Sequence, residues 1–167
     1  MATPILVGED VELGREVFEA LRKDEALRVR AALWWYDQES REWRYLIATP
    51  EYYERGPKAA YLRVRSALKK AGLLPRLPLR RVIVTHPADQ LVRGLSGFIV
   101  TEGPPPWEIG IYDCSFNDLV IAGMLIYYSE GLLVPPLRST PKSTTSKKHK
   151  PKPSLRRKAG HKQAVRS

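Results

Sequence analysis

The side chains that could attack or polarise a phosphodiester are few in this sequence. Glu42, Trp43 and Arg44 form an E-x-R motif at the start of an apolar run, and Asp37 precedes Glu42 by five residues. A metal-dependent nuclease of the PD-(D/E)xK type needs two carboxylates for Mg²⁺ and a cation beside the attacking hydroxide. Here the carboxylates flank a predicted turn, and Arg replaces the usual Lys. Solvated turn charges are the better explanation, so we assign no catalytic residue.

A thiol could act as a nucleophile only with the help of a base. Cys114 is the single cysteine, and His86 is the only histidine before residue 149. A catalytic thiol needs a base and a third group that orients the base. A single cysteine on a strand is usually a small core residue, and a histidine before proline is usually a helix cap or an exposed ring. With one cysteine no intramolecular disulfide forms, which fits a reducing compartment.

Candidate ligands for a metal or cofactor are equally sparse. His149 and His161 stand in a lysine-rich segment with no cysteine or acid between them, so they provide no tetrahedral zinc site. Asp113 and Asp118 flank a predicted turn, and Glu108 begins the strand before it. Three carboxylates on one hairpin could bind a cation, but turns favour aspartate for hydrogen bonds to their own backbone. We predict no metal and no cofactor.

The charge of the chain is distributed unevenly. The 167 residues include 28 Lys and Arg and 18 Asp and Glu, a formal net charge of +10. Residues 135–167 hold eleven of the basic residues and no acid, so residues 1–134 carry 17 basic and 18 acidic side chains and sum to −1. The tail is rich in Ser, Thr and Pro, so we expect it to be disordered. It either binds polyanions without reading their sequence or only solubilises the chain.

Before the tail, positive charge concentrates on one predicted helix. Residues 55–93 contain ten Lys or Arg and one acid, whereas residues 9–25 contain three basic and seven acidic side chains. At about 100° per residue, one arc of the helix carries five cations: Lys58, Arg65 and Lys69, widened by Arg63 and Lys70. This arc either contacts phosphates, with nearby aromatic rings stacking on unpaired bases, or is a solvated face that pairs with the acidic first helix.

The nucleic-acid contacts that we predict come from this helix and from the tail. They are Lys58, Arg65, Lys69, Lys147, Lys148, Lys150, Lys152, Arg156, Arg157 and Lys158.

The spacing of apolar residues predicts eight elements in the order α, β, β, α, β, α, β, β. The predicted helices are 11–23, 56–71 and 86–99, and the predicted strands are 28–36, 43–49, 81–85, 109–111 and 119–128. Two hairpins imply antiparallel pairing, and the helices must cover the sheet, so the class is α+β. We expect one domain over residues 1–134, with about five mostly antiparallel strands and three helices, followed by the tail at 135–167.

One core should join the two longer helices to this sheet. We expect it to contain Tyr61, Val64, Leu68, Val17, Phe18, Leu21, Leu33, Ile47 and Val82. Both faces of the first strand carry an indole, Trp34 and Trp35, so at least one of them must pack against a helix or stay partly exposed.

Two segments carry a resemblance to known proteins: W-Y-D-Q-E-S-R-E-W-R-Y-L-I-A-T-P (35–50) and G-P-K-A-A-Y-L-R-V-R-S-A-L (56–68). They resemble a group of small bacterial proteins of unknown function. Members share a tryptophan hairpin, a Gly-Pro helix start, a short strand that ends in a Pro-Asp helix cap, and a closing hairpin like residues 109–128. The resemblance spans residues 10–130 and implies the same α+β fold, but it implies no activity.

The sequence offers no obvious membrane or secretion segment. Its longest uncharged apolar stretch, Leu119–Tyr128, is about half the length of a membrane-spanning helix. Residues 1–9 carry no basic region ahead of a long apolar run. We therefore expect a cytoplasmic protein.

The favoured function is a non-enzymatic module that associates with DNA or RNA without sequence specificity through its basic tail. A protein partner could contact the hairpin that carries Trp34, Trp35 and Trp43. The alternative is a small hydrolase or nuclease, toxin-like, with acidic residues near the hairpin ends; a third possibility is a homodimer formed through a sheet edge. A pocket that gathers at least two of six side chains would favour the enzyme: Asp37, Glu42, His86, Glu108, Asp113 and Cys114.

Overall fold

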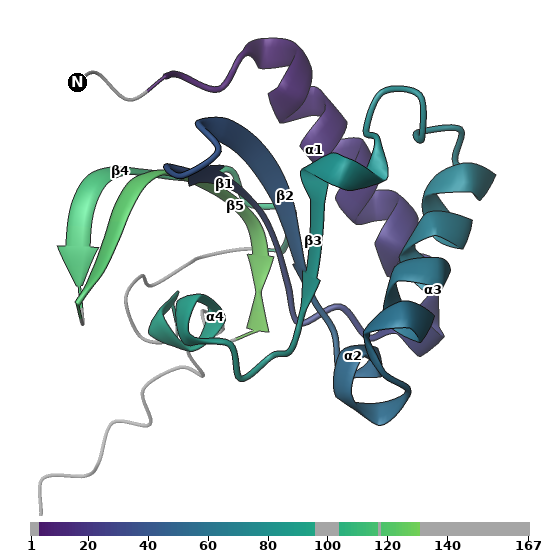
Figure 1. Cartoon of the computed structure of the whole chain (residues 1–167). Helices are drawn as coiled ribbons and strands as arrows, with labels where there is room; N and C mark the ends of the chain where they lie inside the picture. The colour runs from purple at the N-terminus through teal and green to yellow at the C-terminus, as the bar shows by residue number, and fades with distance from the viewer. Residues whose placement is uncertain (1–3, 96–103, 117, 131–167) are drawn as a thin grey trace, which may run out of the picture. The chain divides into compact units, whose positions relative to one another are not determined.

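A computed structural model describes residues 4–95, 104–116 and 118–130, all within the unit Met1–Pro136. These residues form a five-stranded sheet with helices on both faces (Figure 1), which confirms the predicted α+β class. The strands are β1 (Ala31–Asp37), β2 (Glu42–Ala48), β3 (Val82–Thr85), β4 (Ile109–Phe116) and β5 (Leu119–Ser129). The α-helices are α1 (Gly8–Arg22), α2 (Glu51–Glu54), α3 (Pro57–Lys70) and α4 (Gln90–Leu95), and two short 3-10 helices are η1 (Glu25–Leu27) and η2 (Leu79–Arg81).

The sheet is mixed, with the strand order β3-β2-β1-β5-β4. Strand β1 pairs antiparallel with β2, and β4 pairs antiparallel with β5, as the two predicted hairpins require. An antiparallel pairing of β1 with β5 joins the two hairpins into one sheet. Strand β3 pairs parallel with β2. The connection between them contains α2 and α3, and a helical crossover of this kind returns the chain in the same direction.

Helices α1 and α3 pack on the same face of the sheet (Figure 1). Their core residues Val17, Leu21, Val64 and Leu68 are completely buried, as predicted. Contrary to the prediction, Tyr61 is only half-buried: it lies at the sheet edge, where its hydroxyl accepts a hydrogen bond from the Val84 N–H of β3.

The prediction for Leu33 is wrong about the layer in which it packs. Leu33 is buried, but on the opposite face of β1 from Trp34. Alternation along a strand places neighbouring side chains on opposite faces, and both faces of this sheet are covered. Trp34 is completely buried on the α1 side, and Trp35 is half-buried on the other side.

Three aromatic side chains from the sheet hydrogen-bond to the backbone of α1. Trp34 Nε1 donates to Asp10 O at 2.8 Å, Tyr45 Oη to Gly14 O at 2.8 Å and Tyr127 Oη to Val11 O at 2.6 Å. Burial raises the pKa of both the Tyr45 and the Tyr127 hydroxyl. The first half of α1 is thereby fixed on the sheet by directional contacts as well as by apolar packing.

The second face of the sheet packs against α4. Leu91, Val92 and Leu95 are buried there in a cluster with Met124 and Trp107. The predicted helix start at residue 86 is wrong: α4 begins at Gln90, and Pro87 lies in a turn before it. Asp89 caps this later start, since its Oδ1 accepts a hydrogen bond from the Leu91 N–H at 2.9 Å. The predicted extension to Ile99 lies outside the described residues.

Among the described residues, no helix has both the length and the apolar composition needed to cross a membrane. The tail lies outside the described residues, and with it seven predicted contacts: Lys147, Lys148, Lys150, Lys152, Arg156, Arg157 and Lys158. The predicted boundary between residues 134 and 135 stays a prediction.

Candidate functional site

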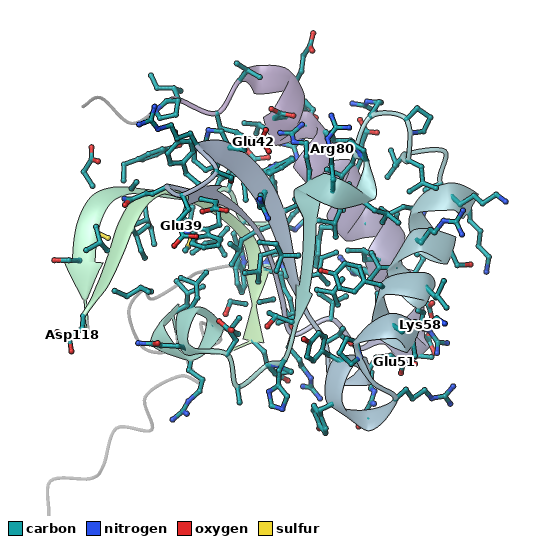
Figure 2. The ribbon with its side chains drawn as sticks, in the orientation of Figure 1. Glu39, Glu42, Glu51, Lys58, Arg80 and Asp118 are labelled. Atoms are coloured by element: carbon teal, nitrogen blue, oxygen red, sulfur yellow. The ribbon has the colours of Figure 1, made fainter. Side chains whose placement is uncertain are left out.

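The exposed face of α3 carries a row of cations. Lys58, Arg65 and Lys69 are all exposed, and they fall within about 40° of one another around the helix axis. The row is about 16 Å long, since eleven residues separate its ends and each adds about 1.5 Å. Leu62 lies in the same arc and is 53% exposed. Figure 2 labels Lys58 at the end of α3 that adjoins α2.

The local sequence determines both where α3 begins and which side of the helix faces outward. Gly56 precedes the helix with φ +90°, a conformation that favours glycine, and Pro57 is its first residue. The inner stripe is formed by the buried residues Ala60, Val64, Ala67 and Leu68. Because this stripe lies against α1 and the sheet, the opposite arc with its cations must face solvent.

The three cations of the row form no ion pair with any acidic side chain in the described part of the chain. Other arginines of the same basic segment do form such pairs: Arg55 with Glu51, Arg63 with Asp24 and Glu51, Arg76 with Glu16, and Arg81 with Asp10. Acidic residues of α1 (Asp10 and Glu16) and of neighbouring segments (Asp24 and Glu51) therefore pair with arginines around α3, whereas the row itself is uncompensated.

Arg63 does not widen the row, contrary to the sequence-based expectation. Its side chain is half-buried, and Nε lies 3.1 Å from Asp24 Oδ2. The hydrogen bond that the guanidinium donates to Asp24 raises the pKa of Arg63. Arg63 is therefore a structural cation. Lys70 is exposed, but it lies about 100° around the helix axis from Lys69, so it does not widen the row either.

The carboxylate of Asp37 is hydrogen-bonded within the turn between β1 and β2. It accepts hydrogen bonds from the Glu39 N–H at 3.0 Å and from Ser40 Oγ at 2.8 Å, and it lies 3.3 Å from Arg44 Nε. Burial alone would raise the pKa of Asp37, but these hydrogen bonds and Arg44 together lower it. Glu42 lies opposite Asp37 in the strand register and is exposed. This arrangement agrees with the turn explanation for both residues.

The possible thiol–imidazole pair is not assembled. His86 follows β3 and Cys114 belongs to β4, and these are the two edge strands of the sheet, with three strands between them. The His86 ring instead accepts a hydrogen bond at Nδ1 from the Ala88 N–H at 2.7 Å. Cys114 is half-buried and packs against the apolar cluster on the α4 side.

The acidic residues of the β4–β5 hairpin are also apart. The Glu108 carboxylate binds Arg15 of α1, and Asp118 occupies a turn with φ +63°. Figure 2 places Asp118 at the tip of this hairpin, far from Glu42 at the other hairpin. Within residues 4–95, 104–116 and 118–130, no group of three His, Cys, Asp or Glu side chains could hold a metal ion.

Three open hollows lie around α1, and none of the six candidate catalytic residues lines them. The first, about 570 Å³, is lined by alanines and by charged residues that include Lys23 and Lys70. The second, about 520 Å³, is mainly apolar and includes Phe18 and Tyr128. The third, about 300 Å³, adjoins Arg15. These hollows bring together no acid–base pair of the kind that the enzyme hypothesis requires.

The tryptophan hairpin does not offer its indoles to a partner. Trp34 is completely buried and Trp43 is 9% exposed, so both belong to the core under α1. Trp35 alone is half-buried on the other face. The predicted protein contact through these three side chains is therefore not supported.

The structure draws attention to one residue that the sequence did not single out. Tyr53 of α2 is 57% exposed, and its ring packs against that of His86. A helix of four residues is too short for a periodic pattern, so no sequence signal marks this ring as exposed. The sequence shows only that two adjacent tyrosines, Tyr52 and Tyr53, stand between Pro50 and Gly56.

Comparison of the chain with models of protein families, with curated proteins and with solved structures finds no match.

Proposed function

We propose that the protein is a non-enzymatic module that binds DNA or RNA without sequence specificity, with Lys58, Arg65 and Lys69 as its ordered phosphate contacts. The observation that carries the proposal is the alignment of three exposed, unpaired cations on one face of α3, in a basic segment whose Arg55, Arg63, Arg76 and Arg81 are all ion-paired. The basic tail supplies additional contacts. The single cysteine, Cys114, fits a reducing compartment, so the proposed location is the cytoplasm.

Unpaired cations are the suitable contacts because they need not give up a partner. Each phosphate that Lys or Arg neutralises releases condensed counterions, which drives binding and makes it dependent on salt. Along the axis of a duplex, the phosphates of one strand are spaced about 3.4 Å apart. A row of about 16 Å that lies along this axis therefore has the length of about five such steps.

The chemistry of the row also explains the proposed lack of sequence specificity. Base readout relies on side chains such as Asn, Gln and bidentate Arg at the edges of bases. The outer arc of α3 offers Leu62 and Ser66 between its cations and no amide side chain. Phosphate contacts fix position and orientation, but they do not distinguish sequences.

The acidic residues of α1 restrict the polyanion to the outer side of α3. Glu9, Glu12 and Glu16 are exposed along α1, which packs beside α3. Although Glu12 and Glu16 lie near arginines, the helix remains acidic overall. A phosphate backbone would be repelled from this face and attracted to the row.

The proposal is tested by the salt dependence of binding. The intact chain and the variant Lys58→Ala/Arg65→Ala/Lys69→Ala are titrated into labelled duplex DNA and RNA at several salt concentrations between about 50 and 200 mM. Loss of three contacts should reduce the slope of log K against log salt by about 2 to 3. A matched control removes three unpaired cations from other elements: Arg41, Arg80 and Arg93.

The control variant has the same net charge as the test variant, so it separates the position of the cations from their number. Binding that both variants reduce equally would reject α3 as the contact surface. An intact protein that binds no nucleic acid at the lowest salt concentration would reject the function altogether. Pull-down from cells with and without nuclease would then identify direct protein partners.

A further inference from the structure

The exposed Tyr53 and the half-buried His86 form an aromatic pair at one end of the sheet. Their ring centroids lie 4.7 Å apart with an interplanar angle of 41°. Parallel pairing of β2 and β3 places Ala48 opposite Thr85, so the chain leaves both strands at the same end of the sheet. Tyr53 follows the first strand and His86 follows the second, which explains how two residues distant in sequence meet.

Both rings are held in place by the surrounding structure. The imidazole of His86 is oriented by its hydrogen bond from the Ala88 N–H. Helix α2, which carries Tyr53, is fixed on both sides: the buried Glu51 pairs with Arg63, and Glu54 pairs with Arg28. A ring that is already ordered loses little conformational entropy when a ligand packs on it.

The aromatic pair is near the end of α3 that α2 contacts, where the cation row begins with Lys58. Tyr53 precedes Lys58 by five residues, so their Cα atoms are separated by at most about 18 Å. Among the described residues, the other exposed aromatic side chain is Tyr112. Tyr112 belongs to β4 at the far edge of the sheet. Tyr53 is therefore the exposed ring that lies near the row.

From this juxtaposition we infer that Tyr53, backed by His86, stacks on an unpaired base of a single-stranded nucleic acid whose phosphates contact Lys58, Arg65 and Lys69. The inference rests on the proposed function and narrows its ligand to a single strand. Proteins that bind single strands without sequence preference combine cations along the backbone with aromatic rings under the bases. In a duplex, each base is already stacked between its neighbours, so Tyr53 would gain no such contact.

Fluorescence anisotropy with the full chain tests the inference. The probes are labelled oligonucleotides of about 12 thymidines and about 12 uridines, a length within the usual range of single-strand sites, and a duplex of the same length. Tyr53→Ala should weaken binding to the single strands by roughly 5- to 150-fold, the range found for removal of one base-stacking ring, and should leave duplex binding nearly unchanged. Tyr53→Phe retains a ring and should bind as the wild type does.

The matched control is Tyr112→Ala, which removes an exposed tyrosine from the other edge of the sheet and should leave binding unchanged. Since Tyr53 is exposed, circular dichroism should show that Tyr53→Ala remains folded. Single-strand binding that Tyr53→Ala leaves intact would overturn the inference without affecting the proposed function. An equal loss on duplex and single strand would also overturn it. Absence of binding by the wild-type chain to every probe would instead reject the proposed function.

Discussion

Gly14 of α1 lies directly against the indole of Trp34. A Cβ atom at residue 14 would stand 2.5 Å from Trp34 Nε1 and would also collide with the ring of Tyr127. Both aromatic side chains are completely buried and hydrogen-bonded to α1. The glycine therefore sets the distance between α1 and the sheet, and the acidic helix keeps its position beside α3 through this contact.

Gly14→Ala should destabilise the fold. Alanine normally favours a helix by about 1 kcal/mol over glycine, but here the methyl group must displace two buried rings. Overpacking of a core costs about 1–3 kcal/mol or more, so we expect a net loss in denaturant-induced unfolding. Gly8→Ala in the same helix is the control, because a Cβ at residue 8 meets nothing within 4 Å. Similar effects at the two positions would contradict the assigned packing.

Leu68→Ala should cost about 2–5 kcal/mol of unfolding free energy, as truncation of a buried leucine does. Leu68 is completely buried between α3 and the sheet, whereas its neighbour Lys69 is exposed in the cation row. Lys69→Ala should change stability by less than about 0.5 kcal/mol. If urea unfolding showed equal losses for the two variants, the orientation of α3 would be wrong.

Arg63→Ala should destabilise the protein by about 3 kcal/mol, because it removes a partner from the buried carboxylate of Glu51. Arg55 also approaches Glu51, at 3.6 Å, but is largely exposed. The control is Arg65→Ala, which removes an unpaired cation from the same helix. Adding Glu51→Gln to Arg63→Ala should restore part of the loss, since the buried charge that Arg55 alone compensates is then gone.

The course of α3 could be predicted from the sequence because its signals are local. Pro57 and Gly72 mark its ends, and the period of Val64 and Leu68 gives its inner face. The role of Arg63 could not be predicted in this way. It lies at the border of the arc, and whether such a residue faces water or an acid depends on Asp24, which is distant in sequence.

The sheet shows the same contrast between local and distant determinants. Turn and alternation signals predict both hairpins. They cannot predict that β3 pairs parallel with β2, since this pairing depends on the crossover through α3. The contact between Tyr53 and His86 is a consequence of that pairing, so it could not be predicted from the sequence either.

Stability should fall at alkaline pH because of the buried tyrosines. Burial raises the pKa of Tyr45 above its usual value of about 10. Since only the unfolded state then ionises readily, the stabilising contribution is complete below about pH 10 and is lost as the pH rises towards the folded-state pKa. Tyr45→Phe should reduce this loss above pH 10, although it removes a hydrogen bond worth about 1 kcal/mol at pH 7.

The measurement is denaturant unfolding at about pH 7 and at about pH 10.5 for each variant. Tyr53→Phe serves as the control, because its hydroxyl belongs to an exposed residue and should not alter the pH dependence. An unchanged alkaline loss in Tyr45→Phe would show that other groups cause it.

The final prediction concerns a shortened chain from which residues 135–167 have been deleted. The apolar clusters of the described fold involve residues no later than Tyr128, and the last described backbone bond joins Glu130 N–H to Arg30 O. Thermal melts of this shorter chain and of the full chain should therefore agree within a few degrees, a shift that corresponds to under about 1 kcal/mol. The shorter chain should still bind single strands through the α3 row, but with a smaller salt slope, because it lacks the eleven cations of residues 135–167. Loss of cooperative unfolding on shortening would instead make the tail part of the fold.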